Sequence, residues 1–196
     1  LDLGITGMRN ALATQFLPDG VHNERTPGYA DWMTQVAANY LRLARLFPEL
    51  DAGVKPDRLA RALDYGAQSE MFGVNDSTAP HRDRASLAKL SLRAELIRSL
   101  RLDGAGAQPP LDQVFPDAGQ VFSRTAWNPG ADYLAFDAST WGGGHNHLSR
   151  LSFVFRSGGR MLVADPGILT YEMSDPRGPY GRYDARNFPH PQEGHN

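Results

Sequence analysis

The apolar residues of this chain change their spacing once, and that change restricts the possible fold more than any other feature of the sequence. Over residues 1–102, large apolar side chains recur every three or four positions, which is the spacing of amphipathic helices. Beyond residue 120 the spacing becomes two, which is typical of β-strands that bury one face. The segment between them begins with DGAGAQPP, the composition of a linker. The sequence therefore predicts an α+β fold in two domains, with a helical unit at 1–102, a linker at 103–119 and a β unit at 120–196.

The same patterns place the individual elements. Helices are expected at 1–16, 28–47, 56–68 and 84–100. The second is the most regular, because it carries an apolar stripe made of Trp32, Val36, Tyr40, Leu43 and Phe47. Thr26 is a good N-cap for this helix, and Pro27 suits its first turn. Strands are expected at 120–126, 132–138, 145–156 and 160–164, with a Ser157-Gly158-Gly159 turn joining the last two into a hairpin.

The composition argues against several classes of function. A formal net charge of -2 over 196 residues offers no electrostatic basis for binding nucleic acid. The chain has no cysteine, so neither a disulfide framework nor a thiolate metal site is possible. No apolar run approaches the roughly 20 residues that span a bilayer, so no membrane insertion is expected. The first residues show neither an initiator Met nor a signal-peptide pattern, and we expect the chain to be a piece of a longer protein.

The run Gly142-Gly143-Gly144-His145-Asn146-His147 places two imidazoles beside three glycines. In a β-strand, residues i and i+2 project from the same face, so we expect His145 and His147 to face one cavity, about 6–7 Å apart. The glycines let another group approach the backbone closely. This arrangement suits a metal ligand beside a catalytic base, and the alternative is a solvated polar pair.

Two later residues can complete a metal site with His147. Asp165 ends a short apolar strand just before Pro166-Gly167, and His195 follows a loop of roughly 30 residues without periodicity. Loops of that length in compact proteins are usually functional or pinned by a ligand. Two imidazoles and a carboxylate make a possible His/Asp/His zinc site. Taken alone, however, Asp-Pro-Gly is more often only a turn.

The loop DGVHNERTPGY, at residues 19–29, is polar and dense in functional groups. Tyr29 falls in the first turn of the following helix, at the end facing the loop, where a tyrosine is more often a packing residue than a catalytic one. Glu24 and Arg25 would ordinarily form a solvated ion pair of little energetic consequence. Three further histidines are expected at the surface: His22, His81 and His190.

In their order along the chain, these motifs resemble the heparinase II/III-like polysaccharide lyases, which include heparin/heparan lyases and oligoalginate lyases. The matching motifs are Pro-Asp-Gly-x-His-x-Glu-Arg-x-Pro-x-Tyr, Gly-Gly-Gly-His-x-His, Val-Ala-Asp-Pro-Gly and the final His-Asn. The resemblance covers nearly the whole chain and is most specific over residues 141–171. It implies the last helices of an (α/α) toroid followed by the start of an antiparallel β-sandwich, with the active site in the cleft between them.

The resemblance also implies a reaction and roles for named residues. Such lyases cleave uronic-acid glycans by β-elimination, and Tyr29 with His145 would form their acid/base pair. His147, Asp165 and His195 would hold a zinc ion that is mainly structural. The residues implied as substrate contacts are Arg25, Glu24, Asn146, Tyr171 and Tyr180. The implied substrate is an acidic polysaccharide or oligosaccharide, such as a glycosaminoglycan or alginate, degraded in the periplasm or outside the cell.

The sequence departs from the family in two places. No Asn or His motif precedes Tyr29 to neutralise the substrate carboxylate, so we expect that residue upstream of this chain. Residues 187–194 intervene before His195, which leaves His190 as a competing third metal ligand. Because the stripe of the second helix would lack partner helices, we expect the 196 residues made alone to be inactive and loosely packed or aggregated.

Three other functions compete with the lyase. Glycine followed by His-x-His also begins the metal site of cupin-like oxygenases, although cupins add a Glu at about the position where Leu151 and Ser152 stand here. A hydrolytic zinc enzyme would use three protein ligands and an open coordination position. In a non-catalytic glycan-binding module, the histidines would only pin a loop.

Overall fold

The structure, a computed structural model, describes residues 2–50, 55–69, 75, 77, 85–100, 102, 108–140, 145 and 150–165, and for residues 85–90 the backbone alone. The helices are α1 (Asp2–Thr14), α2 (Pro27–Leu46), the short 3-10 helix η1 (Pro48–Leu50), α3 (Pro56–Gln68) and α4 (Ala85–Ser99). The strands are β1 (Asp112–Phe115), β2 (Gln120–Arg124), β3 (Tyr133–Asp137), β4 (Ser152–Ser157) and β5 (Arg160–Val163). The α+β class expected from the change in spacing is confirmed.

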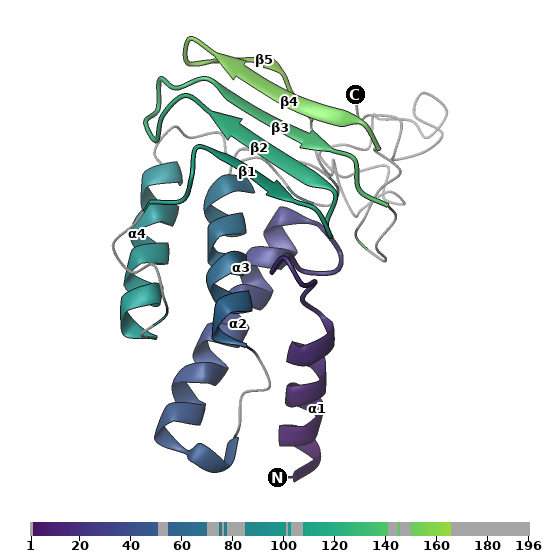
Figure 1. Ribbon diagram of the computed structural model, residues 1–196, viewed down its shortest axis with the longest axis vertical. Coiled ribbons are helices and arrows are strands. Elements are labelled where there is room, and N and C mark those ends of the chain that lie inside the picture. Colours follow the sequence, from purple (N-terminus) through teal and green to yellow (C-terminus); the bar gives the residue numbers. More distant parts are fainter. Residues whose placement is uncertain are drawn as a thin grey trace, which may run out of the picture.

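The five strands form one antiparallel sheet in the order β1-β2-β3-β4-β5, so each strand pairs with its neighbour in the sequence. Alternate residues of β2, β3 and β4 are buried, and these face the helices, which all lie on one side of the sheet in Figure 1. Gly158 and Gly159 both have positive φ, at 55° and 75°, which is the conformation that tight hairpin turns require. The predicted turn between the last two strands is therefore confirmed.

Helix α3 joins the two parts of the core. Its Leu59, Ala62 and Leu63 pack in a cluster formed with α1, α2 and α4. Further along the same helix, Tyr65 packs edge-on against Phe115 of β1 and Phe122 of β2. Consecutive turns of α3 thus contact first the other helices and then the sheet, which fixes where the helices meet the strands.

Two expectations about the strands are wrong. The strand expected from residue 145 begins at Ser152, because Leu151 has a left-handed φ of 71° that an extended strand cannot accommodate. Strand β1 was not expected, since it is short and buries only Phe115. It lies inside the segment 103–119, and the division of the chain into domains stays a prediction.

Only part of the apolar stripe predicted for α2 packs against the core, where Tyr40 lies half-buried. The fully buried residues of this helix are small or polar ones, namely Pro27, Ala30, Thr34, Ala37 and Ala38. Trp32 keeps 61% of its surface exposed, and Leu43 and Phe47 are also largely exposed. The small side chains let α2 approach α3 closely, whereas Trp32, Leu43 and Phe47 are turned to solvent. None of the described helices is long and apolar enough to cross a lipid bilayer.

The outer face of the sheet is also apolar. A row of paired residues crosses it from β1 to β4, with Val114 opposite Val121, Val121 opposite Phe136, and Phe136 opposite Phe153. Val114 and Phe153 are exposed at the two ends of this row. The sheet therefore carries apolar side chains on both faces, a pattern found where a sheet is covered on both sides.

A substitution at Gly119 tests how closely the β1–β2 connection approaches the residues that follow β3. It has φ 74°, and a Cβ there would lie 2.8 Å from the Cα of Ser139. Gly159 has nearly the same φ, 75°, but nothing lies within 4 Å of its Cβ position. We expect Gly159→Ala to cost about 1–2 kcal/mol of unfolding free energy from the left-handed backbone alone. Gly119→Ala should cost about 1–3 kcal/mol more from the clash, measured by denaturant unfolding. Equal losses would show that the close approach is wrong.

Candidate functional site

The candidate site is built on the loop between α1 and α2, which is fastened to both parts of the fold. The carboxylate of Asp19 accepts hydrogen bonds from the backbone N–H of Val21 at 3.2 Å and of Ala118 at 2.8 Å. A bridge between Phe16 and His22 closes the loop. Because Asp19 is buried and holds both its own loop and the β1–β2 connection, the loop is fixed relative to the sheet.

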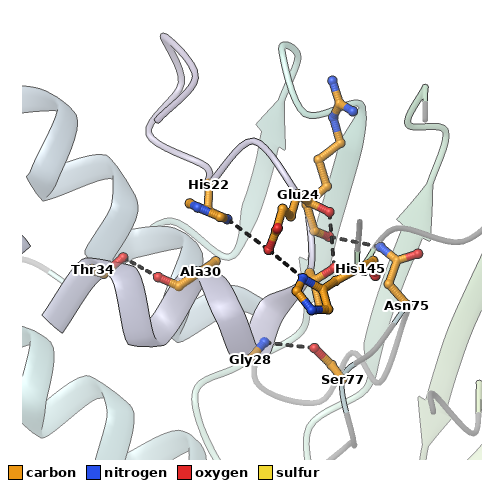
Figure 2. A network of polar contacts seen from close by, with 10 residues as sticks. His22, Glu24, Gly28, Ala30, Thr34, Asn75, Ser77 and His145 are labelled. Atoms are coloured by element: carbon orange, nitrogen blue, oxygen red, sulfur yellow. Dashed lines mark hydrogen bonds and ion pairs between the residues drawn. The ribbon is translucent and has the colours of Figure 1, made fainter. Parts of the chain in front are cut away.

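The carboxylate of Glu24 lies between two histidines, as Figure 2 shows. Its Oε2 is 3.0 Å from Nδ1 of His145 and 3.7 Å from Nδ1 of His22. Within the described residues neither Nδ1 makes a hydrogen bond of good geometry, so these are close contacts rather than aligned hydrogen bonds. A carboxylate in this place stabilises a positive charge on either imidazole.

Tyr29 and His145 are stacked on one another. Their ring centroids are 3.8 Å apart and their planes differ by 21°. Tyr29 lies in the first turn of α2, as expected, whereas His145 lies in a turn after β3. Stacking occupies the faces of the two rings, and the phenol oxygen and imidazole nitrogens lie at the ring edges. The contact therefore brings two groups capable of proton transfer side by side.

Arg25 and Thr26 hold the segment that carries His145. The guanidinium Nη1 of Arg25 donates to the carbonyl of Thr140 at 2.7 Å. The hydroxyl of Thr26 lies 2.9 Å from the carbonyl of His145 and 3.1 Å from that of Glu24. Thr26 occupies the N-cap position of α2, but its side chain makes no capping hydrogen bond there. Its hydroxyl instead links the helix start to a residue 119 positions later.

His22 was expected at the surface, and this expectation is wrong. Only 5% of its surface is exposed, and its ring meets that of Phe16 edge-on. Burial lowers the pKa of His22, an effect that the carboxylate of Glu24 opposes and His145 reinforces. The folded protein therefore favours neutral His22. The sequence indicates a role for His22 in the site only through its position, two residues before Glu24 in the loop between α1 and α2.

The structure brings together four of the predicted site residues: Glu24, Arg25, Tyr29 and His145. His145 lies in a turn rather than in the strand predicted for the His-x-His pair, and the common face predicted for the two imidazoles stays a prediction because His147 lies outside the described residues. Asp165 lies buried just after β5. The remaining predicted residues lie outside the described part of the chain, namely Asn146, His147, Tyr171, Tyr180 and His195, with the competing His190 and also His81.

Within the described residues, no group of three His, Asp or Glu side chains has the arrangement of a metal site. Of the three expected ligands, only Asp165 falls in this part of the chain. Its carboxylate is buried at the end of a strand, which suits a metal ligand supplied by a turn. The zinc site stays a prediction.

The chain matches one protein family and several solved structures. Residues 107–187 match the family described as heparinase II/III-like, C-terminal. A solved heparinase III has a TM-score of 0.73 and 20% identity, over 99% of this chain and 32% of that one. The heparan sulfate lyase HepC from Pedobacter heparinus has a TM-score of 0.66 and 18% identity, over 97% of this chain and 31% of that one.

A further heparinase III structure gives a TM-score of 0.66 and 19% identity, covering 98% of this chain and 34% of that one. At these identities the likeness shows a shared fold. The chain spans about a third of the length of each of these structures. No curated protein matches the sequence.

The lowered pKa of His22 predicts how stability depends on pH. Because the folded pKa lies below the ordinary value of about 6.5, the unfolded chain binds the proton more readily. This contribution to stability is complete above about pH 6.5 and is lost as the pH falls through the folded pKa. We expect His22→Phe, which keeps a ring against Phe16, to reduce the loss of unfolding free energy between pH 8 and pH 5. An identical loss in variant and wild type would show that His22 does not titrate as described.

Proposed function

We propose that this chain, whose residues 107–187 match the heparinase II/III-like family, is the part of a polysaccharide lyase that carries its acid/base pair. The observation that carries the proposal is the stacking of Tyr29 on His145 at 3.8 Å, across the junction between helices and sheet. The substrate we propose is a uronic-acid-containing polysaccharide or oligosaccharide. The family match over residues 107–187 and the heparinase-like fold support this class of substrate, and the site chemistry supports the reaction.

The reaction requires two proton transfers at neighbouring positions of the sugar. A base removes the proton at C5 of the uronic acid, and an acid protonates the glycosidic oxygen that leaves C4. The electron pair of the C5–H bond forms the new C4–C5 double bond, and the C4–O bond breaks with its electrons going to the oxygen. Tyr29 and His145 are the groups that we assign to these transfers jointly, because a phenol and an imidazole in contact can present an acid and a base to adjacent atoms.

The surroundings of the pair suit an anionic substrate and a charged intermediate. Removing the C5 proton shifts charge onto the uronate carboxylate, which cationic or hydrogen-bonding groups must stabilise. Arg25 donates a hydrogen bond to the carbonyl of Thr140, five residues before His145. We propose that its guanidinium also contacts the substrate. The carboxylate of Glu24 lies against the imidazole of His145, so we propose that it orients this imidazole rather than binding the substrate. Asn146, Tyr171 and Tyr180 stay proposals from family resemblance.

We propose that the apolar surfaces of the chain are covered in the natural protein. The outer face of the sheet, from Val114 to Phe153, fits a second sheet of a β-sandwich. The exposed residues of the α2 stripe, Trp32, Leu43 and Phe47, fit further helices of an (α/α) toroid. Each large apolar side chain so covered would contribute roughly 1.5–3 kcal/mol to stability.

We also propose that zinc is bound by His147, Asp165 and His195 and acts mainly on the folding of the β part. When bound, the ion would fasten the end of β5 to the segments on either side of it. The proposed location of the protein is the periplasm or the exterior of the cell, where acidic polysaccharides are degraded.

Tyr29→Phe tests the acid/base assignment, with Tyr40→Phe as its matched control on the same helix. Tyr40 donates its hydroxyl hydrogen bond to the carbonyl of Leu50, away from the site. In the full-length protein with heparan sulfate, chondroitin sulfate or alginate, we expect Tyr29→Phe to lower kcat by about 100-fold or more. Tyr40→Phe should keep wild-type activity. The readout is the ultraviolet absorbance of the new double bond, and a Tyr29→Phe enzyme within a few-fold of wild type would remove this tyrosine from the mechanism.

His145→Ala and His147→Ala separate catalysis from metal binding. His145→Ala should abolish turnover while keeping the zinc content and most of the melting temperature. His147→Ala should lose zinc, melting temperature and activity together, because its expected role is to hold the metal. Elemental analysis and calorimetry of both variants measure the difference. Equal losses of metal and stability would indicate a pair of metal ligands instead.

A further inference from the structure

We infer that Gln120 is a positioning residue for the Tyr29–His145 pair, an inference that rests on the proposed function. Gln120 is the first residue of β2, and its side chain is fully buried between the helices and the sheet. It touches neither ring of the pair. It holds the turn from which Glu24, Arg25 and Thr26 reach the segment that carries His145.

The amide of Gln120 makes contacts in three directions. Its Nε2 donates to the carbonyl of Arg25 at 3.1 Å and to Oδ2 of Asp137 at 3.4 Å. Its Oε1 accepts from the hydroxyl of Tyr65 at 2.8 Å. A backbone carbonyl can only accept, so the group facing Arg25 must be the NH2, and this settles the orientation of the amide. The amide is fixed in this orientation, because rotating it would place its oxygen against the carbonyl of Arg25 and the carboxylate of Asp137.

The residue held by this amide has an unfavourable backbone conformation. Arg25 has a left-handed φ of 55°, a conformation that is unfavourable for a residue other than glycine. Such conformations persist only where their surroundings hold them. The carbonyl of Arg25 accepts two side-chain amides, from Gln120 and from Asn75, each at 3.1 Å. Its own N–H donates to the carbonyl of His22 at 2.9 Å, which closes the turn.

This turn controls where His145 lies. The side chains of Arg25 and Thr26 bind the carbonyls of Thr140 and His145, two ends of the same short segment. If the backbone at Arg25 relaxed to a negative φ, both side chains would change direction and the segment would lose both anchors. His145 would then move relative to Tyr29, which is fixed in α2. Displacements of about 1 Å in such pairs can lower a catalytic rate by about 100-fold.

Gln68 provides a matched control for Gln120. It is also fully buried at the junction of helix and sheet. Its amide nitrogen donates to the carbonyl of Pro110 at 2.6 Å, and its oxygen accepts from Nε of Arg124 at 3.2 Å. Arg124 is the last residue of β2 and Pro110 lies just before β1, so neither partner belongs to the turn at Arg25. Methionine has nearly the shape of glutamine, so Gln120→Met and Gln68→Met remove comparable hydrogen bonds and leave little cavity.

The first test compares these two variants in the full-length protein with heparan sulfate as the probe. We expect Gln120→Met to lower kcat by at least about 10-fold, with KM changed by less than about 3-fold. Gln68→Met should lose a similar melting temperature but keep wild-type kcat. If both variants lose stability alike and neither loses kcat, Gln120 is only a structural residue and the inference is overturned. Tyr65→Phe, which removes the hydroxyl that anchors the amide, replaces Gln120→Met if that variant does not fold, and unchanged kcat in it would overturn the inference equally.

A second measurement separates this inference from the proposed function. If the wild-type protein produces no unsaturated product from heparan sulfate, chondroitin sulfate or alginate, the proposed function fails. The crystal structure of Gln120→Met then decides the positioning role by itself. We expect φ of Arg25 to become negative and the separation of the Tyr29 and His145 rings to exceed its present 3.8 Å. An unchanged turn and an unchanged ring separation would overturn the inference.

Discussion

The packing of Tyr65 between Phe115 and Phe122 is the interaction on which the rest of the structure depends. The ring joins α3 to the first two strands, and its hydroxyl continues the contact to Gln120. Edge-to-face aromatic contacts are specific in distance and angle, so they fix helix and sheet relative to each other more narrowly than aliphatic packing would. The site needs this precision because Tyr29 belongs to the helices and His145 to the connection after β3.

Charge and backbone strain are concentrated where these two parts meet. Arg25 keeps a left-handed backbone, and Glu24 is placed between two histidines, one of which burial keeps neutral. Neither feature stabilises the fold by itself. Both persist because Gln120 and Asn75 hold the turn from the sheet side and from the connection after α3. Strain that is held in this way is often found at functional sites, where it keeps a reactive group in place.

The sequence predicted well what local patterns determine. The spacing of apolar residues located α2 and α3 to within one residue, and Gly158-Gly159 predicted the last hairpin, because each depends on its own segment alone. It also brought Tyr29 and His145 to one site through family motifs. It did not predict that the strand begins only at Ser152, because the left-handed conformation of Leu151 just before it is not evident from the residue type. His22 and Gln120 were missed because their burial comes from segments far apart in the sequence.

The central claim is that the sugar reacts between Tyr29 and His145, at the junction of helices and sheet. The most direct test is a crystal structure of the full-length Tyr29→Phe protein with a bound heparan sulfate tetrasaccharide. The claim predicts that C5 of one uronic acid lies within about 4 Å of both the residue 29 ring edge and the His145 imidazole, close enough for proton transfer when the phenol is present. A tetrasaccharide bound elsewhere, with its uronic acids away from both rings, would contradict it.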